Sequence, residues 1–405
     1  MATIRPFPAL RPVPQRARDV AAVPYDVVTT EEARALASDN PWSFLHVSRA
    51  EIDLPDGTDP YSPDVYRKAA ENFERLSRDG ALTREREPAL YIYRLGMGEH
   101  VQTGIAGAFS IDEYDLKVIL KHERTRRDKE DDRTRHMMAL RAQTGPVFLT
   151  YRGRPEVDDL VARAVRETPL YDFAAADGIS HAIWRLPPGT SAGLAREFDR
   201  VPFLYIADGH HRAASASRAR DEFRERSDRA GGAAEYDFFL GVAFPASQVR
   251  ILPYNRLVSD LGGRSADDFL FALKQRVGVS MDAAPAPSRR GEVSMYLAGR
   301  WYSLRLSPGP AAEALDVTLL QDAIFAPLLG VRDVRIDKRI EFVGGIRGTS
   351  ALERAVDERR AAVAFSLFPV AVEDLMKVAD ANEIMPPKST WFEPKLRDGL
   401  LIHEI

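Results

Sequence analysis

The segment from Asp208 to Arg212 carries the densest group of chemically useful side chains in this chain. It places a carboxylate, a glycine, two imidazoles and a guanidinium side by side, as Asp208-Gly209-His210-His211-Arg212. Apolar residues precede the group and an alanine-rich stretch follows it, which predicts a buried strand, a tight turn and a helix start. Free N–H groups at a helix start attract anions, and neighbouring His and Arg side chains add donors. The corner therefore predicts a phosphate-binding site.

Two other interpretations of this corner stay open. It can be plain turn chemistry with solvated histidines. It can also be a metal site, because Asp208, His210 and His211 are all legitimate ligands. Their contiguous spacing differs from the i, i+4 spacing that a zinc-binding helix requires.

His122 and Glu123 form a second candidate group, directly after a strand-like run over residues 116–121. Strand ends are where sites collect in α/β sheets, and a carboxylate there can act as a general base or hold a metal ion. A basic segment over residues 124–135 follows and includes Arg126 and Lys129. These cations predict contact with a polyanionic donor, although a salt-bridged, solvent-facing helix explains the same charges.

A third group lies near the end of the chain. Residues 386–390 combine two prolines with Lys388, Ser389 and Thr390, which is a rigid turn offering one cation and two hydroxyls. Such a turn can hold phosphate or carboxylate oxygens, and an ordinary loop with a helix cap is the alternative.

The elements that must position these groups alternate between helices and strands. A strand at 203–207 leads into a helix over 211–226, and the run at 116–121 leads into a helix that reaches about residue 143. Similar alternation elsewhere predicts a mixed α/β or α+β class.

Composition limits the function classes. At 405 residues, with 45% hydrophobic and 29% charged residues, the chain is long enough for two or three domains. The formal net charge of −4 gives no general attraction to nucleic acid or to an anionic membrane. The absence of cysteine excludes disulfides, thiolate catalysis and Cys-ligated zinc. Without an apolar leader or a membrane-length apolar run, a cytoplasmic location is expected.

Taken together and in order, seven motifs resemble the bacterial and archaeal family catalogued as domain of unknown function 1015. The likeness covers nearly the whole chain. The matching pieces are Ala22-Val23-Pro24-Tyr25-Asp26, Asn40-Pro41-Trp42-Ser43-Phe44-Leu45, Lys121-His122-Glu123-Arg124-Thr125, Gln143-Thr144-Gly145-Pro146, Asp208-Gly209-His210-His211-Arg212, Leu252-Pro253-Tyr254-Asn255-Arg256 and Met385-Pro386-Pro387-Lys388-Ser389-Thr390.

Three of these pieces also resemble, more distantly and in the same order, the free-serine kinases of the ParB/sulfiredoxin fold. Those enzymes phosphorylate the hydroxyl of the free amino acid. The resemblance implies catalytic roles for Glu123, as the base, and for Asp208. It implies phosphate binding at the helix start with His210, His211 and Arg212, and substrate binding at Lys388, Ser389 and Thr390. Apart from the resemblance, we expect Gly209, Arg126 and Lys129 to contact the phosphoryl donor and His122 to contact the substrate. The chain departs from those kinases in its roughly 110 residues before the first motif and in its basic segment at 124–135.

The expected architecture is a ParB/sulfiredoxin-like core over residues 116–260, an added N-terminal α/β region over 1–115, and a C-terminal α/β portion over 261–405. The expected activity is transfer of a phosphoryl group from ATP, ADP or pyrophosphate to a small hydroxylated metabolite, most simply free L-serine, with Mg²⁺ bound through Asp208. A nucleotide-binding switch without turnover and a metal-dependent phosphohydrolase or nuclease are the alternatives. A homodimer is compatible with the sequence, whereas nucleic-acid and membrane partners are not expected.

Overall fold

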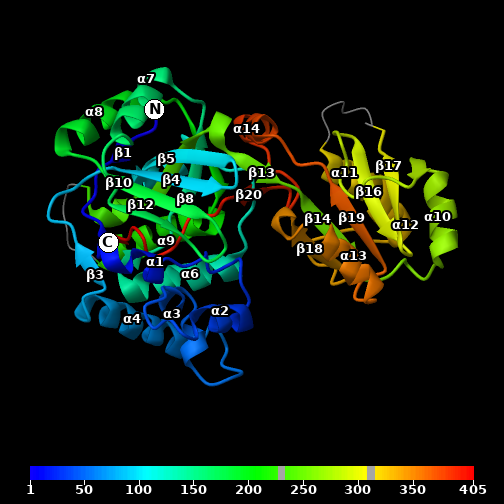
Figure 1. Ribbon diagram of the computed structural model, residues 1–405, viewed down its shortest axis with the longest axis horizontal. Helices are drawn as coiled ribbons and strands as arrows, with labels where there is room; N and C mark the ends of the chain where they lie inside the picture. The colour runs from blue at the N-terminus through cyan, green and yellow to red at the C-terminus, as the bar shows by residue number, and fades with distance from the viewer. Residues whose placement is uncertain (227–232, 308–314) are drawn as a thin grey trace. The chain divides into compact units, whose positions relative to one another are not determined.

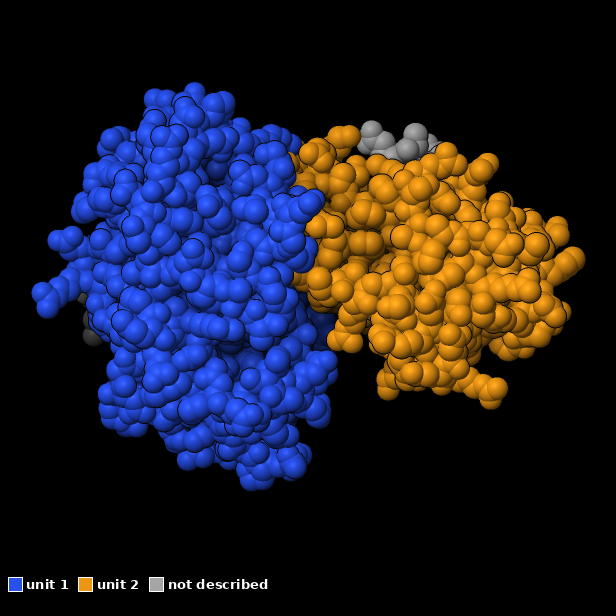
Figure 2. Space-filling view, viewed as in Figure 1, with its two compact units in different colours: residues 1–249, 394–405 blue, residues 250–393 orange. Residues whose placement is uncertain are grey.

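The computed structural model describes residues 1–226, 233–307 and 315–405. The chain forms two compact units, drawn in different colours in Figure 2. Unit 1 contains residues 1–249 and 394–405, and unit 2 contains residues 250–393. Each unit has its own sheet and its own hydrophobic core, and strands and helices mix in both. The mixed α/β class predicted from the sequence is therefore confirmed.

The two compact units do not follow the three expected segments. The expected boundary at 115/116 falls inside unit 1, and the one at 260/261 falls inside unit 2. Strand β5 (His100–Ser110) pairs with β12 (Phe238–Pro245) over six residue pairs, which joins the N-terminal region to the core of the same sheet. Such long-range pairing leaves no trace in local sequence periodicity, so the sequence does not reveal this union.

The sheet of unit 1 has nine strands within the described residues, and β1 (Ile4–Arg5) pairs with β5 beside the main path. The order of the main path is β6 (Ile119–Leu120), β11 (Leu204–Asp208), β8 (Val147–Tyr151), β12, β5, β4 (Tyr91–Met97), β10 (Ser180–Arg185) and β9 (Tyr171–Ala174). β6 runs parallel to β11 and β8 runs parallel to β12, whereas the other pairs are antiparallel. The two catalytic candidates therefore lie at the ends of two neighbouring parallel strands. Glu123 follows β6, and Asp208 is the last residue of β11.

Helices cover both sides of this sheet (Figure 1). The pair α7 (Pro155–Ala164) and α8 (Pro188–Phe198) lies on one side, and the pair α6 (Arg127–Leu140) and α9 (His210–Arg226) lies on the other. The small residues of α9 face the sheet, because Ala213, Ala216 and Ala219 are buried in its main hydrophobic core. Small side chains let the helix approach the strands closely, which holds the start of α9 directly at the end of β11.

The N-terminal helices add a layer over α6, shown in blue in Figure 1. Helix α2 (Thr30–Ala37) begins directly after a capping box that Thr29 and Glu32 form. A separate apolar core lies between this layer and the end of α6, with Phe44, Phe73 and Leu140 among its buried members. The helices of the layer are α1 (Ala17–Val20), α2 (Thr30–Ala37), α3 (Leu45–Ser48) and α4 (Pro63–Arg78).

The last twelve residues return to unit 1 after the chain has built unit 2. Strand β21 (His403–Glu404) pairs with β7 (Ala142–Gln143), and Ile402 pairs through its backbone with Leu10. Asp398 is bridged to Ala22 in the same manner. This returning segment therefore contributes side chains to unit 1 from the far end of the sequence.

Unit 2 is built on an antiparallel six-stranded sheet within the described residues. One apolar core contains residues of α10 (Ala266–Lys274), α11 (Asp316–Leu320) and α12 (Ala326–Leu329), and a second, smaller core contains residues of α13 (Ser350–Asp357). The strand order is β15 (Gly278–Met281), β17 (Arg300–Arg305), β16 (Glu292–Leu297), β19 (Val363–Leu367), β14 (Tyr254–Val258) and β18 (Ile340–Gly344). A short ladder of β13 (Arg250–Leu252) with β20 (Trp391–Glu393) brings the two ends of the unit together.

None of the helices in the described ranges is both long enough and apolar enough to cross a membrane. Helix α9, at 17 residues, illustrates the reason, since it carries five arginines.

Candidate functional site

The predicted strand-to-helix corner is present in unit 1. Strand β11 ends at Asp208, Gly209 makes the turn, and α9 begins at His210. Gly209 has a φ of +91°, and a Cβ atom there would lie 3.3 Å from the Cα of Val147. Only glycine adopts this backbone conformation without strain, and the tight space excludes a side chain as well. The glycine therefore allows the helix start to follow the strand within a single residue.

The carboxylate of Asp208 is held in its ionised form. Its Oδ2 atom accepts a hydrogen bond from Nζ of Lys395 at 2.9 Å, and its Oδ1 atom accepts one from the backbone N–H of Gly209 at 2.9 Å. Burial alone would raise the pKa of Asp208, but Lys395 and Arg212 outweigh it and hold the pKa well below its usual range. With both oxygens engaged, a Mg²⁺ ion on Asp208 would have to compete with Lys395.

Arg212 faces into unit 1. Its side chain is buried, donates to the backbone carbonyl of Pro146 and lies 4.0 Å from a carboxylate oxygen of Asp26. Burial opposes the charge, but Asp26, Asp208 and Asp398 together raise the pKa of Arg212. Arg212 therefore supplies a permanent positive charge behind the corner, near the carboxyl groups of Asp26, Asp208 and Asp398.

The side chains of His122 and His210 are in contact. His122 lies just after the end of β6, and His210 is the first residue of α9. Their rings lie edge to face with centroids 4.5 Å apart, and both side chains are buried. One ligand-type atom each of His122, Glu123 and His210 lies within 4.8 Å of the other two. Because Asp208 precedes His210 by two residues, the structure brings the two widely separated acidic candidates to one place. Burial lowers the pKa of His122 to about 4 and also lowers the pKa of His210, so both imidazoles are neutral near pH 7.

His211 joins the corner to the basic segment. Its Nε2 atom accepts a hydrogen bond from the backbone N–H of Arg126 at 3.1 Å. Arg126 is the N-cap residue of α6, so the contact places the N-terminus of α6 beside the N-terminus of α9. Two helix N-termini thus lie close together, and N–H groups at a helix start favour a bound anion.

The side chains of the basic segment are mostly engaged with other groups of unit 1. Arg126 pairs with Asp128 at 2.7 Å, and Nζ of Lys129 donates to the hydroxyl of Tyr61 at 2.7 Å. Arg133 is half-buried, pairs with Asp132 and lies over the ring of Tyr25. Lys129 and Arg133 line a polar cavity of about 170 Å³ between the N-terminal layer and α6. The predicted roles of Arg126 and Lys129 in donor binding stay predictions.

The late Lys-Ser-Thr turn lies in unit 2. Lys388 has a φ of 56°, its carbonyl accepts a hydrogen bond from Arg256 at 2.9 Å, and its Nζ lies 5.6 Å from the ring centre of Tyr254. Ser389 donates to the carbonyl of Pro386 at 2.6 Å and lines a cavity of about 160 Å³ in unit 2. The predicted role of residues 388–390 in substrate binding stays a prediction.

A Gly-x-Ser-x-Gly sequence at residues 189–193 resembles the nucleophile turn of some hydrolases, but its structure differs. It lies within α8, and Ser191 is buried, with its hydroxyl bonded to the backbone of Leu90 and Leu186. A nucleophile turn needs an exposed serine between a strand and a helix. Ser191 therefore has a structural role.

The sequence did not indicate two residues of the site, Lys395 and Asp398. Both belong to the returning segment, residues 394–405. Lys395 neutralises Asp208, and Asp398 lies against Gly145, where a Cβ atom would approach Oδ1 of Asp398 to 2.4 Å. Asp26, which lies near Arg212, belongs to one of the motifs that resemble the family. The sequence therefore drew attention to Asp26 but indicated no role for it. Neither Lys395 nor Asp398 lies in a local pattern that indicates chemistry.

Asp398 predicts a pH dependence of stability. Burial raises its pKa to about 7, even though Arg212 favours the charged form. The unfolded value is about 3.9, so the folded state binds the proton more tightly, and this stabilisation is lost as pH rises toward and through the folded pKa. In the parent, the titration of Asp398 should lower the free energy of unfolding by up to about 4 kcal/mol between about pH 4 and pH 8. Asp398→Asn should remove this contribution.

Denaturant unfolding across that pH range measures this effect. If the free energy of unfolding changed with pH in the same way in the Asp398→Asn variant and in the parent, Asp398 would not titrate with a raised pKa.

Several solved structures are distantly similar to this chain. SbnI with a C-terminal truncation, from Staphylococcus aureus, is 11% identical with a TM-score of 0.37, over 72% of this chain and 85% of that chain. A free serine kinase in complex with AMP is 12% identical with a TM-score of 0.36, over 73% and 92%. A conserved hypothetical protein from Pyrococcus furiosus is 13% identical with a TM-score of 0.34, over 74% and 94%. No curated protein matches the chain.

The family comparison covers much more of the chain than any single motif. A family model described as protein of unknown function (DUF1015) matches residues 4–318, which include the His-Glu pair, the Asp-Gly-His-His-Arg corner and Gly145. The match extends over more than three quarters of the sequence. The chain therefore belongs to the DUF1015 family.

Proposed function

We propose that this protein is a phosphotransferase that moves a phosphoryl group from ATP, ADP or pyrophosphate to the hydroxyl of a small metabolite, most simply free L-serine. The observation that carries the proposal is the convergence of Glu123 with the corner that starts at Asp208, at a point where two helix N-termini also meet. Phosphoryl transfer depends mainly on positioning and charge neutralisation, and this arrangement supplies both.

The donor phosphates would lie against the starts of α6 and α9. Backbone N–H groups of both helices would face them, and the turn at Gly209 allows close approach of the main chain. His210 and His211 would add ring donors or acceptors, while Arg212 would act from behind the corner through its charge. A Mg²⁺ ion that arrives with the donor phosphates need not contact Asp208, since Mg²⁺ is commonly held by substrate phosphates and water.

Glu123 is the better candidate for the base that takes the proton of the acceptor hydroxyl. Asp208 is fixed as the partner of Lys395 and has a depressed pKa, so it is a weak proton acceptor. Its proposed role is electrostatic, beside the reacting groups. The motif resemblance to free-serine kinases supports Glu123 as base, the ParB/sulfiredoxin-like core and the Lys388–Thr390 segment as a substrate contact.

Product analysis tests the proposal directly. The full chain is incubated with ATP, ADP or pyrophosphate, with Mg²⁺ and each amino acid in turn, and phosphorylated products are identified by mass spectrometry and ³¹P NMR. O-phosphoserine formed at a rate that depends on enzyme and donor is the expected result. Release of inorganic phosphate alone would support a phosphohydrolase instead, and saturable donor binding without any product would support a nucleotide-dependent switch.

A further inference from the structure

Three side chains of metal-ligand type meet where the two motifs of unit 1 converge. His122 and Glu123 follow β6, and His210 is the first residue of α9. One ligand atom of each lies within 4.8 Å of the other two. We propose that His122, Glu123 and His210 bind one divalent transition-metal ion of the zinc, cobalt or manganese class. The binding stands independently of the proposed function, and only its role in catalysis rests on that function.

A second observation points to the same ion. Nε2 of His210 has no hydrogen-bond partner among the described residues. The atom is buried and the residue is only 6% exposed, so bulk water does not satisfy it either. A buried polar atom left unsatisfied costs about 1–3 kcal/mol, so native proteins rarely retain one without a reason. Because the His210 ring lies against the His122 ring and a ligand atom of His210 lies within 4.8 Å of one on Glu123, a metal ion held by these residues is a natural partner for an unsatisfied imidazole nitrogen.

The distances suit coordination after a small adjustment. Zinc binds imidazole nitrogen at about 2.0–2.1 Å, and a tetrahedral arrangement then separates ligand atoms by about 3.3 Å. Starting from at most 4.8 Å, the three atoms need to approach one another by no more than about 1.5 Å, which side-chain rotation supplies.

The ligand chemistry selects the class of metal. Two imidazoles with one carboxylate suit zinc, cobalt or manganese, whereas magnesium and calcium prefer oxygen ligands alone. The carboxylates of Glu123 and Asp208 offset the positive end of α9, which would otherwise repel a cation. Asp208 keeps its own partners, Lys395 and Gly209, and so lies outside the ligand set.

Three protein ligands leave an open position, as catalytic metal sites do. In the proposed reaction, the acceptor hydroxyl would occupy that position. One oxygen of Glu123 would bind the ion, and the other would accept the hydroxyl proton. The hydroxyl oxygen would form a bond to the transferred phosphorus as the bond between that phosphorus and the donor's leaving oxygen breaks.

Cobalt binding to the full chain tests the site without any reaction. Metal-free protein is titrated with Co²⁺, followed by its visible absorption, and then with competing Zn²⁺, in the absence of nucleotide and serine. One ion per chain is expected. His210→Gln and His122→Gln should each weaken binding by more than the roughly 10- to 100-fold that loss of an outer partner costs. His136→Gln is the matched control, because His136 is also buried, its Nε2 bonds to the carbonyl of Val47, and it is not part of the group with His122, Glu123 and His210.

The outcomes separate the metal site from the proposed function. Absence of saturable Co²⁺ binding in the parent protein would overturn the inference, even if Mg²⁺-dependent transfer to serine occurs. Unchanged affinity in both folded histidine variants, with native-like thermal unfolding, would overturn it as well. Stoichiometric binding that both variants lose and His136→Gln retains would support the site, even if no phosphorylated product is ever found.

Discussion

Replacing Glu123 with glutamine is expected to slow phosphoryl transfer to serine by about 10²- to 10⁴-fold, the range over which a general base contributes. The amide has nearly the same size as the carboxylate but accepts no proton at neutral pH. The loss should appear in kcat, because the hydroxyl proton is transferred in the chemical step. Initial rates of O-phosphoserine formation at saturating donor measure it.

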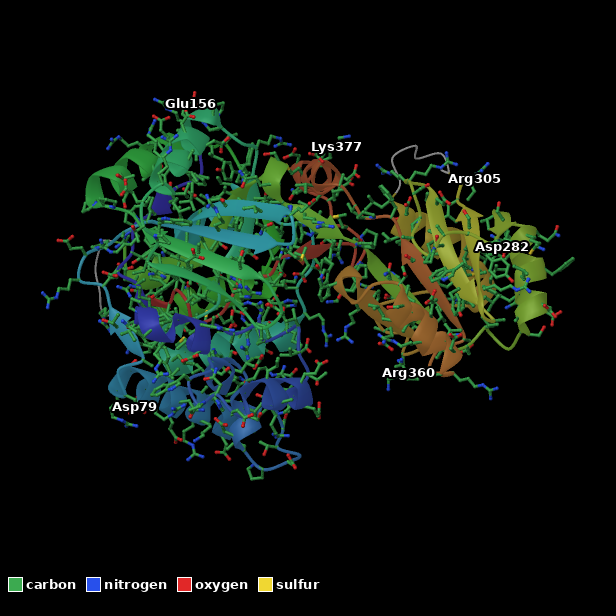
Figure 3. All side chains as sticks on the ribbon, in the orientation of Figure 1. Asp79, Glu156, Asp282, Arg305, Arg360 and Lys377 are labelled. Carbon is green, nitrogen blue, oxygen red and sulfur yellow. The ribbon has the colours of Figure 1, made fainter. Side chains whose placement is uncertain are left out.

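A matched control is available on the surface of unit 1. Glu156 lies in the first turn of α7, away from the corner, and its side chain is labelled in Figure 3. Glu156→Gln removes the same charge from an exposed position and should leave the rate unchanged. An undiminished rate in Glu123→Gln, with the control also active, would remove Glu123 from the mechanism and leave the base unassigned.

The second large effect concerns the ion pair between Lys395 and Asp208. Lys395→Met is expected to lower the free energy of unfolding by about 3 kcal/mol, because it leaves a mostly buried carboxylate without its nearest cation. The pKa of Asp208 should rise in the variant, since Lys395 contributes most to holding it down. Urea unfolding at neutral pH measures the stability difference.

A double-mutant cycle isolates the pair itself. Asp208→Asn and the combined variant complete the cycle, and the double variant should lose less than the sum of the single losses. Lys117→Met, at an exposed lysine of the same unit, should change stability by no more than about 0.5 kcal/mol. Strict additivity of the Lys395 and Asp208 variants would mean that the 2.9 Å contact makes no net contribution.

Local patterns in the sequence predicted the corner of the site well. Apolar residues before Asp208 and small residues after His211 indicate a strand and a helix, and the glycine between them marks the turn. The capping pair Thr29 and Glu32 likewise marks the start of α2. These features depend on near neighbours in the chain, so periodicity and turn chemistry are enough to find them.

Contacts between distant segments could not be predicted in the same way. Lys395 reaches Asp208 from 187 positions away, and no local signal distinguishes it from other lysines. The expected boundary at 115/116 differs from the compact units for the same reason, because β5 and β12 pair across most of unit 1. The contact between Lys129 and Tyr61 likewise joins distant parts of the chain, and the donor role predicted for Arg126 and Lys129 stays a prediction.

The late return of residues 394–405 has a consequence for biosynthesis. A ribosome that has released the first 249 residues from its exit tunnel has presented every strand of the large sheet, but it has not yet made the lysine that neutralises Asp208. In the nascent protein, Asp208 therefore gains Lys395 as a partner only after the whole of unit 2 has been made. Premature termination anywhere within unit 2 would yield the strands of the large sheet without Lys395 and would leave Asp208 without that partner.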